Sequence, residues 1–301
     1  MSNNRFIIIF LLGISALFGG SQGVVTSEQV LEEFIWNHCF TPQKMSTQQV
    51  RTITQSRYKK LPLKPIIKIK NNTQFWELNQ QGKISMMYRT EKINDSITDT
   101  TVRWNFYKNN QLTMIKKTGV AGIVVTSISY KNDLPIRFVY GKSKNKSSSK
   151  IKLEIDSYEE GRSEYLEHTT FGKKNLQTSF KSSDGVTFKV ITTEIKDTNS
   201  EVISTQFPFQ PNKDYVIEKT SELGQTKSLL VRNKTETSTQ YEFFYDSLLI
   251  EINTQKPGYD PHTAHTELIY EEQTGLLKAI IQQNLQSKEI EIMKYHYTYY
   301  E

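Results

Sequence analysis

A short phrase that recurs along the chain most constrains its fold. In the clearest copies, at residues 243–252 and 268–280, an apolar and aromatic run ends in tyrosine, a polar turn follows, and leucine opens a second apolar run. Looser copies lie at residues 104–115 and 128–139. Two strand-length apolar runs joined by a short turn are the sequence form of a β-hairpin. The phrase therefore predicts a sheet made of successive hairpins.

The rest of the chain extends this pattern. From residue 75 onward, short runs rich in Val, Ile, Phe and Tyr alternate with Asn, Gly and Lys turns, and no room is left for crossover helices. We expect an all-β fold, a mainly antiparallel sheet of successive hairpins that can be curved or form a half-barrel, with one or two N-terminal helices. The 301 residues suffice for one β domain or two. A joint is expected near 141–150, a basic serine-rich loop, or near 207–212, which contains two prolines.

Residues 1–23 have the pattern of a signal peptide. Arg5 precedes an apolar run from residue 6 to 12, and small residues follow as far as Gly23. The run is shorter than the roughly 20 residues that a transmembrane helix needs. We therefore expect export to the periplasm or the extracellular space, with no transmembrane segment in the mature chain.

Residues 24–58 are predicted to be a helical segment. Thr26 and Gln29 have capping-box spacing, and an apolar stripe follows at Val30, Leu31, Phe34 and Ile35. This predicts a helix over 26–40 and a second, weaker helix over 46–57. The large β domain then covers residues 59–301.

Residues 58–70 alternate lysines with apolar residues and contain two prolines. Because native sheets protect exposed edges with Lys and Pro, the segment predicts an edge strand. Binding to an anionic glycan or lipid head group is the alternative. The net charge of +6 is a mild excess that favours an anionic partner. Nucleic-acid readers concentrate positive charge more tightly, so no nucleic-acid partner is expected.

The hairpin phrase also carries a family resemblance. Tyr245-Asp246 with Leu248-Leu249, and Tyr270-Glu271 with Gly275-Leu276-Leu277, resemble the YD-type (Rhs-like) β-hairpin repeat of bacterial secreted and envelope proteins. The copies here are more widely spaced than in regular arrays of that repeat. The resemblance implies a hairpin-built sheet and export, and it brings no catalytic residue.

Candidate chemistry is confined to one loop. Asp260, His262 and His265 lie within six residues, with Glu267 just beyond, and imidazole with carboxylate suits zinc or another divalent ion. Pro257, Gly258 and Pro261 mark a loop, so the other interpretation is a polar turn that happens to contain histidine. The lone Cys39, next to His38, is interpreted as a buried structural thiol. No cofactor is expected.

Three functions fit these features. The first is a non-catalytic secreted or envelope protein that binds a protein, glycan or envelope component on a sheet face or edge. The second is a carrier that holds a lipid or another amphiphile in the cavity of a curved sheet. The third is a metal-dependent hydrolase that uses His262 and His265. The sequence does not decide whether the protein is an enzyme.

Overall fold

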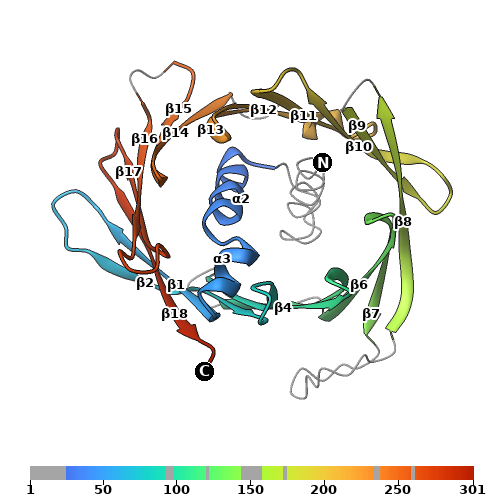
Figure 1. Ribbon diagram of the computed structural model, residues 1–301, viewed down its shortest axis with the longest axis horizontal. Helices are drawn as coiled ribbons and strands as arrows, with labels where there is room; N and C mark the ends of the chain where they lie inside the picture. Colours follow the sequence, from blue (N-terminus) through green and yellow to red (C-terminus); the bar gives the residue numbers. More distant parts are fainter. Residues whose placement is uncertain are drawn as a thin grey trace.

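The chain forms one closed antiparallel β-barrel, and the structure describes two helices inside it (Figure 1). The computed structural model describes residues 25–92, 98–119, 122–143, 158–171, 175–233, 238–258 and 262–301. The expectation of an all-β antiparallel fold with N-terminal helices is confirmed. The sheet is a complete ring of 18 strands rather than an open or half-closed one.

The elements follow in simple order along the chain. The helices are α2 (Ser27–Cys39) and α3 (Pro42–Thr47), with a 3-10 turn η1 (Pro211–Lys213) between two strands. The strands are β1 (Val50–Lys60), β2 (Ile67–Leu78), β3 (Ile84–Lys92), β4 (Thr98–Lys108), β5 (Gln111–Gly119), β6 (Gly122–Lys131), β7 (Leu134–Ser143), β8 (Tyr158–Phe171), β9 (Asn175–Ser182), β10 (Thr187–Ile195), β11 (Ser200–Gln206), β12 (Tyr215–Glu222), β13 (Gln225–Asn233), β14 (Thr239–Asp246), β15 (Leu248–Gln255), β16 (Ala264–Tyr270), β17 (Leu277–Asn284) and β18 (Ile290–Tyr299).

Each strand pairs with its neighbours in sequence, and the first strand pairs with the last. β1 pairs with β2 on one side and with β18 on the other, where Ile53 lies opposite Tyr297. At the expected joint near 207–212, β11 and β12 pair directly, so the sheet is continuous there. Most of the other expected joint, residues 144–150, lies outside the described residues.

The four predicted hairpins are all present, at β4–β5, β6–β7, β14–β15 and β16–β17. Asn109 and Asn110 have φ of 48° and 68°, and Asn132 and Asp133 have φ of 52° and 63°. Two consecutive positive φ angles match the right-handed twist of hairpin strands, and Asn and Asp accept them at low cost.

The antiparallel order gives the barrel two different ends. Connections that follow even-numbered strands, such as Asn109–Asn110 and Ser247, are mostly tight and form what we call the turn end. Connections that follow odd-numbered strands form the loop end, which includes residues 61–66 and 207–214.

One expectation about the N-terminal region is wrong. Residues 50–57 belong to strand β1, not to a second helix, because β2 and β18 offer paired edges on both sides. The second helix is α3, which ends at Thr47. Residues 58–70 form the tip of the β1–β2 hairpin. Strand β2 pairs with β3 only from Gln74 onward, so the expected edge strand is present at residues 67–70, which have no pairing partner on the β3 side among the described residues.

Helix α2 packs its aromatic side chains onto the inner wall of the barrel. The predicted capping box is present, with Gln29 N donating to Thr26 Oγ1 at 3.3 Å and Thr26 N to Gln29 Oε1 at 3.0 Å. The ring centroids of Phe34 and Phe243 on β14 lie 4.4 Å apart, and Trp36 and Trp76 on β2 are separated by 4.6 Å. Neither of the described helices is long and apolar enough to cross a membrane.

Helix α3 covers part of the turn end. Lys44 Nζ donates to the Gly275 carbonyl at 2.6 Å, and Ser46 Oγ donates to the Gln80 carbonyl at 2.7 Å. Gly82, with φ of 72°, lies so close that a Cβ placed on it would be 2.0 Å from the Pro42 carbonyl oxygen. The helix is therefore fixed to the turns of two separate hairpins.

Candidate binding surface and interior clusters

Large apolar side chains share the outer face of four neighbouring strands, β2 to β5. Trp76 contacts Trp36 inside the barrel, so Phe75, its neighbour on the strand, points outward. Phe75 is paired with Tyr88 on β3, and Tyr88 with Val102 on β4, so all three side chains point outward. We call the set the outer aromatic patch; its members, all partly exposed, are Phe75, Met86, Tyr88, Val102, Trp104, Phe106 and Met114.

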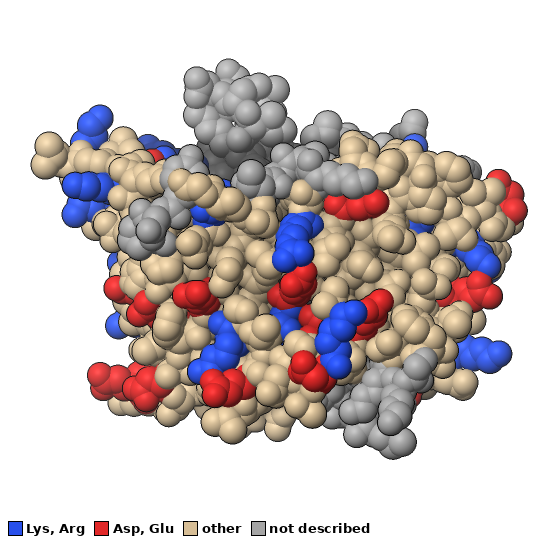
Figure 2. Space-filling view, turned by 90° about the horizontal axis from the view of Figure 1, so that it is seen from above, with Lys and Arg blue, Asp and Glu red and all other residues tan. Residues whose placement is uncertain are grey.

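The patch differs from the outer wall on the other side of the ring. Across β12 and β13, Glu218 pairs with Arg232 at 2.9 Å, and on β16 the ring of His265 lies 3.3 Å from a carboxylate oxygen of Glu267. Figure 2 looks onto the wall drawn at the top of Figure 1 and shows acidic and basic side chains interspersed across it. On β12 to β16 charged side chains are interspersed on the outer face, together with the exposed apolar side chains of Phe244, Ile250 and Ile269.

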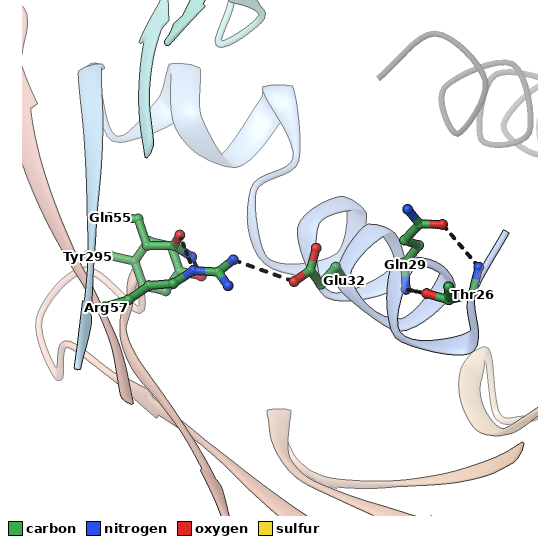
Figure 3. Close-up of polar contacts among 6 residues, drawn as sticks. All are labelled: Thr26, Gln29, Glu32, Gln55, Arg57 and Tyr295. Atoms are coloured by element: carbon green, nitrogen blue, oxygen red, sulfur yellow. Dashed lines mark hydrogen bonds and ion pairs between the residues drawn. The ribbon is translucent and has the colours of Figure 1, made fainter. Parts of the chain in front are cut away.

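Inside the barrel, a chain of polar contacts links α2 to β1 and β18 (Figure 3). Glu32 on the helix lies 3.5 Å from Arg57 Nη2, and Arg57 Nε donates to Gln55 Oε1 at 3.3 Å. Gln55 Nε2 in turn donates to the Tyr295 hydroxyl at 2.9 Å. These bonds satisfy polar groups on the inner wall and hold the helix against the strand pair that closes the barrel.

Glu33 is the carboxyl group most affected by burial. Its side chain is on α2 and the residue is only 3% exposed. Burial raises its pKa to about 8, while Asn37 and the more distant Arg103 guanidinium act in the opposite direction. Oε2 has no hydrogen-bond partner among the described residues. A carboxyl group in this environment is mostly protonated at neutral pH and can donate a hydrogen bond.

Cys39 is buried, as expected, and lies in a cluster of tyrosines. Its Sγ is 3.5 Å from the Tyr270 hydroxyl, and burial raises the pKa of the thiol to about 11. His38 does not pair with it: the imidazole packs edge-on against the Tyr245 ring at 5.6 Å. A protonated thiol without a base has the character of a structural side chain rather than a nucleophile.

Lys189, on β10, is another buried ionisable group. Its Nζ lies 4.9 Å from the centre of the Phe180 ring and 5.9 Å from that of Phe207. Burial lowers its pKa to about 8, and the negative charge of Glu164 acts in the opposite direction. Glu164 accepts a hydrogen bond from the Tyr140 hydroxyl at 3.0 Å. The aromatic faces and the carboxylate together compensate the buried ammonium in part.

The residues of the predicted metal loop do not form a described site. Asp260 lies outside the described residues. His265 is on the outer face of β16, where Nδ1 lies 2.9 Å from Asn253 Oδ1. His262 precedes the strand, and its Nδ1 is buried without a partner among the described residues. Within that same part of the chain, no three His, Cys, Asp or Glu side chains are arranged to hold a metal ion. The site with Asp260 stays a prediction.

Sequence reasoning missed the outer aromatic patch. Strand β4 alternates Val102, Trp104 and Phe106 with Arg103 and Asn105. Such alternation normally places the apolar set inside. The structure does the reverse: Arg103 and Asn105 are buried within the barrel and share a hydrogen bond of 2.8 Å. The signal available in the sequence was that both alternating sets of β4 are regular, one apolar and one polar. The polar set, Arg103 and Asn105, can form a hydrogen bond within itself and so can be buried.

Comparison with known proteins gives only distant similarities. No family model matches the chain, and no curated protein matches its sequence. Among solved structures, a porin-like protein from Bacteroides uniformis is 9% identical with a TM-score of 0.40, and 83% of this chain aligns with 97% of that one. OmpT, an outer membrane protein of Vibrio cholerae, is 9% identical over the same shares, with a TM-score of 0.20. The TcdB2-TccC3 structure is 11% identical with a TM-score of 0.22, and 72% of this chain aligns with 12% of that one. With TM-scores this low, none of these likenesses supports a functional argument.

Proposed function

We propose that the protein is a non-catalytic, exported envelope protein that binds a protein partner on the outer aromatic patch of β2 to β5. The observation that carries this proposal is the patch itself. Exposed apolar groups that are contiguous over several strands mark interaction sites in soluble domains, whereas isolated ones are ordinary. Aromatic residues and methionine are also the residues enriched at protein interfaces.

The export part of the proposal rests on residues 1–23, which have the charge and apolar pattern of a secretory signal. Their removal would leave a mature N-terminus between Ser21 and Val24. Mass spectrometry of protein recovered from the envelope or the medium tests this directly. An exported chain that retains Met1 would contradict it.

The arrangement inside the barrel favours binding on the outside over carriage of an amphiphile. The inward aromatic residues Trp76, Phe243 and Tyr295 are already packed by Trp36, Phe34 and Phe40 of the N-terminal segment. On this side of the barrel, helix α2 and the following Phe40 occupy the position that a bound amphiphile would take.

Site-specific crosslinking tests the proposal. A photoreactive amino acid is placed at Tyr88, at the centre of the patch, or at Phe244, which is 43% exposed on the outer face of β14. We expect one discrete crosslinked product in envelope preparations from Tyr88 and none from Phe244. The product should disappear when Met86→Ser and Trp104→Ser are combined, because the two residues are cross-strand neighbours at the centre of the patch.

The outcome that contradicts the proposal is equally clear. Crosslinking that is the same from both positions, or that survives the double substitution, would show that the patch is not the binding surface. The fold of the double variant is checked by thermal unfolding. Replacement of two partly exposed side chains should leave the melting transition cooperative.

A further inference from the structure

We infer that the loop end of the barrel docks onto an anionic lipid bilayer, with the tip of the β1–β2 hairpin entering the head-group layer. In Figure 1 this hairpin, drawn in light blue, projects outward from the ring. The inference is independent of the partner proposed for the outer aromatic patch, which lies on the wall of the barrel.

The tip presents bulky apolar side chains to water. Leu63 is 106% exposed, and Ile66 and Ile67 are 54% and 55% exposed. No other group of three consecutive or near-consecutive large apolar residues is this exposed among the described residues. Apolar side chains on a protruding loop can enter the interface between head groups and acyl chains, where their transfer from water is favourable.

The backbone of the tip supports a role beyond turn formation. Leu63 has a φ of 59°, in the left-handed region. Glycine or asparagine would occupy that conformation at lower cost than a branched side chain. A leucine that is strained and at the same time fully solvated stabilises neither the turn nor the core. Its side chain is therefore available for an external apolar phase.

Positive charge surrounds these apolar residues. Lys60, Lys64, Lys68 and Lys70 are all exposed, and the sequence has no acidic residue between Arg51 and Trp76. Clustered lysines are attracted to the negative surface potential of a bilayer that contains anionic lipids. The combination of apolar insertion with surrounding lysines fits such a bilayer better than a soluble polyanion, which would leave the apolar side chains in water.

The chain offers a matched control at the opposite end of the barrel. Leu223, in the β12–β13 turn, is 97% exposed with a φ of 51° and follows Glu222. It shares the exposure and backbone conformation of Leu63 but lies at the turn end without a lysine cluster. If exposure alone caused membrane association, Leu223 would contribute as much as Leu63.

The test uses the full-length mature protein and one fluorescent probe. Cys39 is 1% exposed, so a thiol-reactive, polarity-sensitive dye can be directed to Leu63→Cys or to Leu223→Cys. Vesicles of phosphatidylglycerol mixed with phosphatidylcholine are compared with vesicles of phosphatidylcholine alone. We expect both labelled proteins to cosediment with the anionic vesicles and not with the neutral ones. A blue shift is expected only for the dye at Leu63→Cys, because the dye at Leu223→Cys lies at the end of the barrel that stays in water.

Variants then separate the two contributions to binding. Combining Lys60→Gln, Lys64→Gln and Lys68→Gln should weaken vesicle binding by about fivefold per lysine. Leu63→Gly should keep the turn and its stability but weaken binding by roughly tenfold, since the apolar side chain is lost. The Leu223→Gly protein should bind vesicles as the native protein does, and so should the Met86→Ser/Trp104→Ser variant of the outer patch.

Three results would overturn the inference. The first is equal binding to neutral and anionic vesicles. The second is binding to heparin, used as a soluble polyanion, without any blue shift on vesicles; that would identify the tip as a site for anionic polymers. The third is unchanged vesicle binding in the lysine and Leu63→Gly variants.

Discussion

The Tyr270 hydroxyl on β16 donates a hydrogen bond of 2.7 Å to the carbonyl oxygen of Leu249 on β15. Tyr270 is the tyrosine of one hairpin phrase, and Leu249 belongs to the leucine pair of the phrase before it. The contact therefore joins two successive copies of the repeated phrase. It explains why tyrosine, and not phenylalanine, ends the first strand of this copy.

The same bond recurs around the turn end of the barrel. Tyr130 donates to the Leu112 carbonyl at 2.8 Å, and Tyr297 donates to the Leu277 carbonyl at 2.5 Å. Tyr107 makes the equivalent bond to Ile84 at 3.0 Å. In each case the tyrosine is near the end of an even-numbered strand and the acceptor is near the start of the preceding strand. This recurrence gives a structural reason for the tyrosine at the end of these strands.

Replacement of Tyr270 by Phe should destabilise the protein by about 1 to 2 kcal/mol. The substitution keeps the ring but removes the donor of the hydrogen bond to the Leu249 carbonyl. Tyr88→Phe is the control, because the Tyr88 side chain is partly exposed on the outer face of β3, away from the tyrosine contacts at the turn end. Chemical denaturation of both variants measures the difference. An equal loss of stability in the two proteins would show that the hydrogen bond is not the cause.

Gly82→Ala should be among the most damaging small substitutions in the chain. The added Cβ would lie 2.0 Å from the Pro42 carbonyl oxygen and would sit on a backbone with a φ of 72°. We expect a loss of about 3 kcal/mol or more, because backbone has to move in α3 or in the turn. Gly185→Ala, where φ is 85° and the surroundings are open, should cost only about 1 kcal/mol. Similar melting temperatures for the two variants would contradict the close contact between α3 and the β2–β3 turn.

Glu33→Gln should change how stability depends on pH. The pKa of Glu33 is raised from 4.5 to about 8 in the folded protein, so its contribution is fully present below pH 4.5 and is lost as the pH rises towards 8. The variant should therefore match the native protein near pH 4 and exceed its stability at pH 8 by roughly 2 to 4 kcal/mol. Glu32→Gln, which alters an exposed ion pair with Arg57, should show no such trend. Melting curves at several pH values test both variants.

Lys189→Met should stabilise the protein at neutral pH by about 2 kcal/mol. The pKa of Lys189 is lowered from 10.5 to about 8 in the folded protein. The neutral side chain therefore contributes fully to folding stability above pH 10.5, and this contribution is lost as the pH falls to 8. The difference in free energy of unfolding between the variant and the native protein should narrow as the pH is raised from 8 to 10.5. A gap that does not change over this range would mean that the lysine is charged at little cost, through Glu164 and the aromatic rings.

Local features of the fold were predictable because their causes are local. The turns at Asn109–Asn110 and Asn132–Asp133 follow from residues that accept positive φ, and the start of α2 follows from the capping box at Thr26. The hairpin phrase identified the antiparallel sheet for the same reason. Each of these signals is complete within about ten residues of sequence.

The tertiary structure decided what depends on distant partners. Residues 50–57 became a strand because β18, about 240 residues later, supplies the second edge that closes the ring. Strand β4 placed Arg103 and Asn105 inside and Trp104 outside, because hydrogen bonds in the interior stabilise a polar face that the alternation alone would assign to water. The sequence by itself determined the hairpins, whereas pairing across the whole chain determined that they form a closed barrel and which side of each strand faces out.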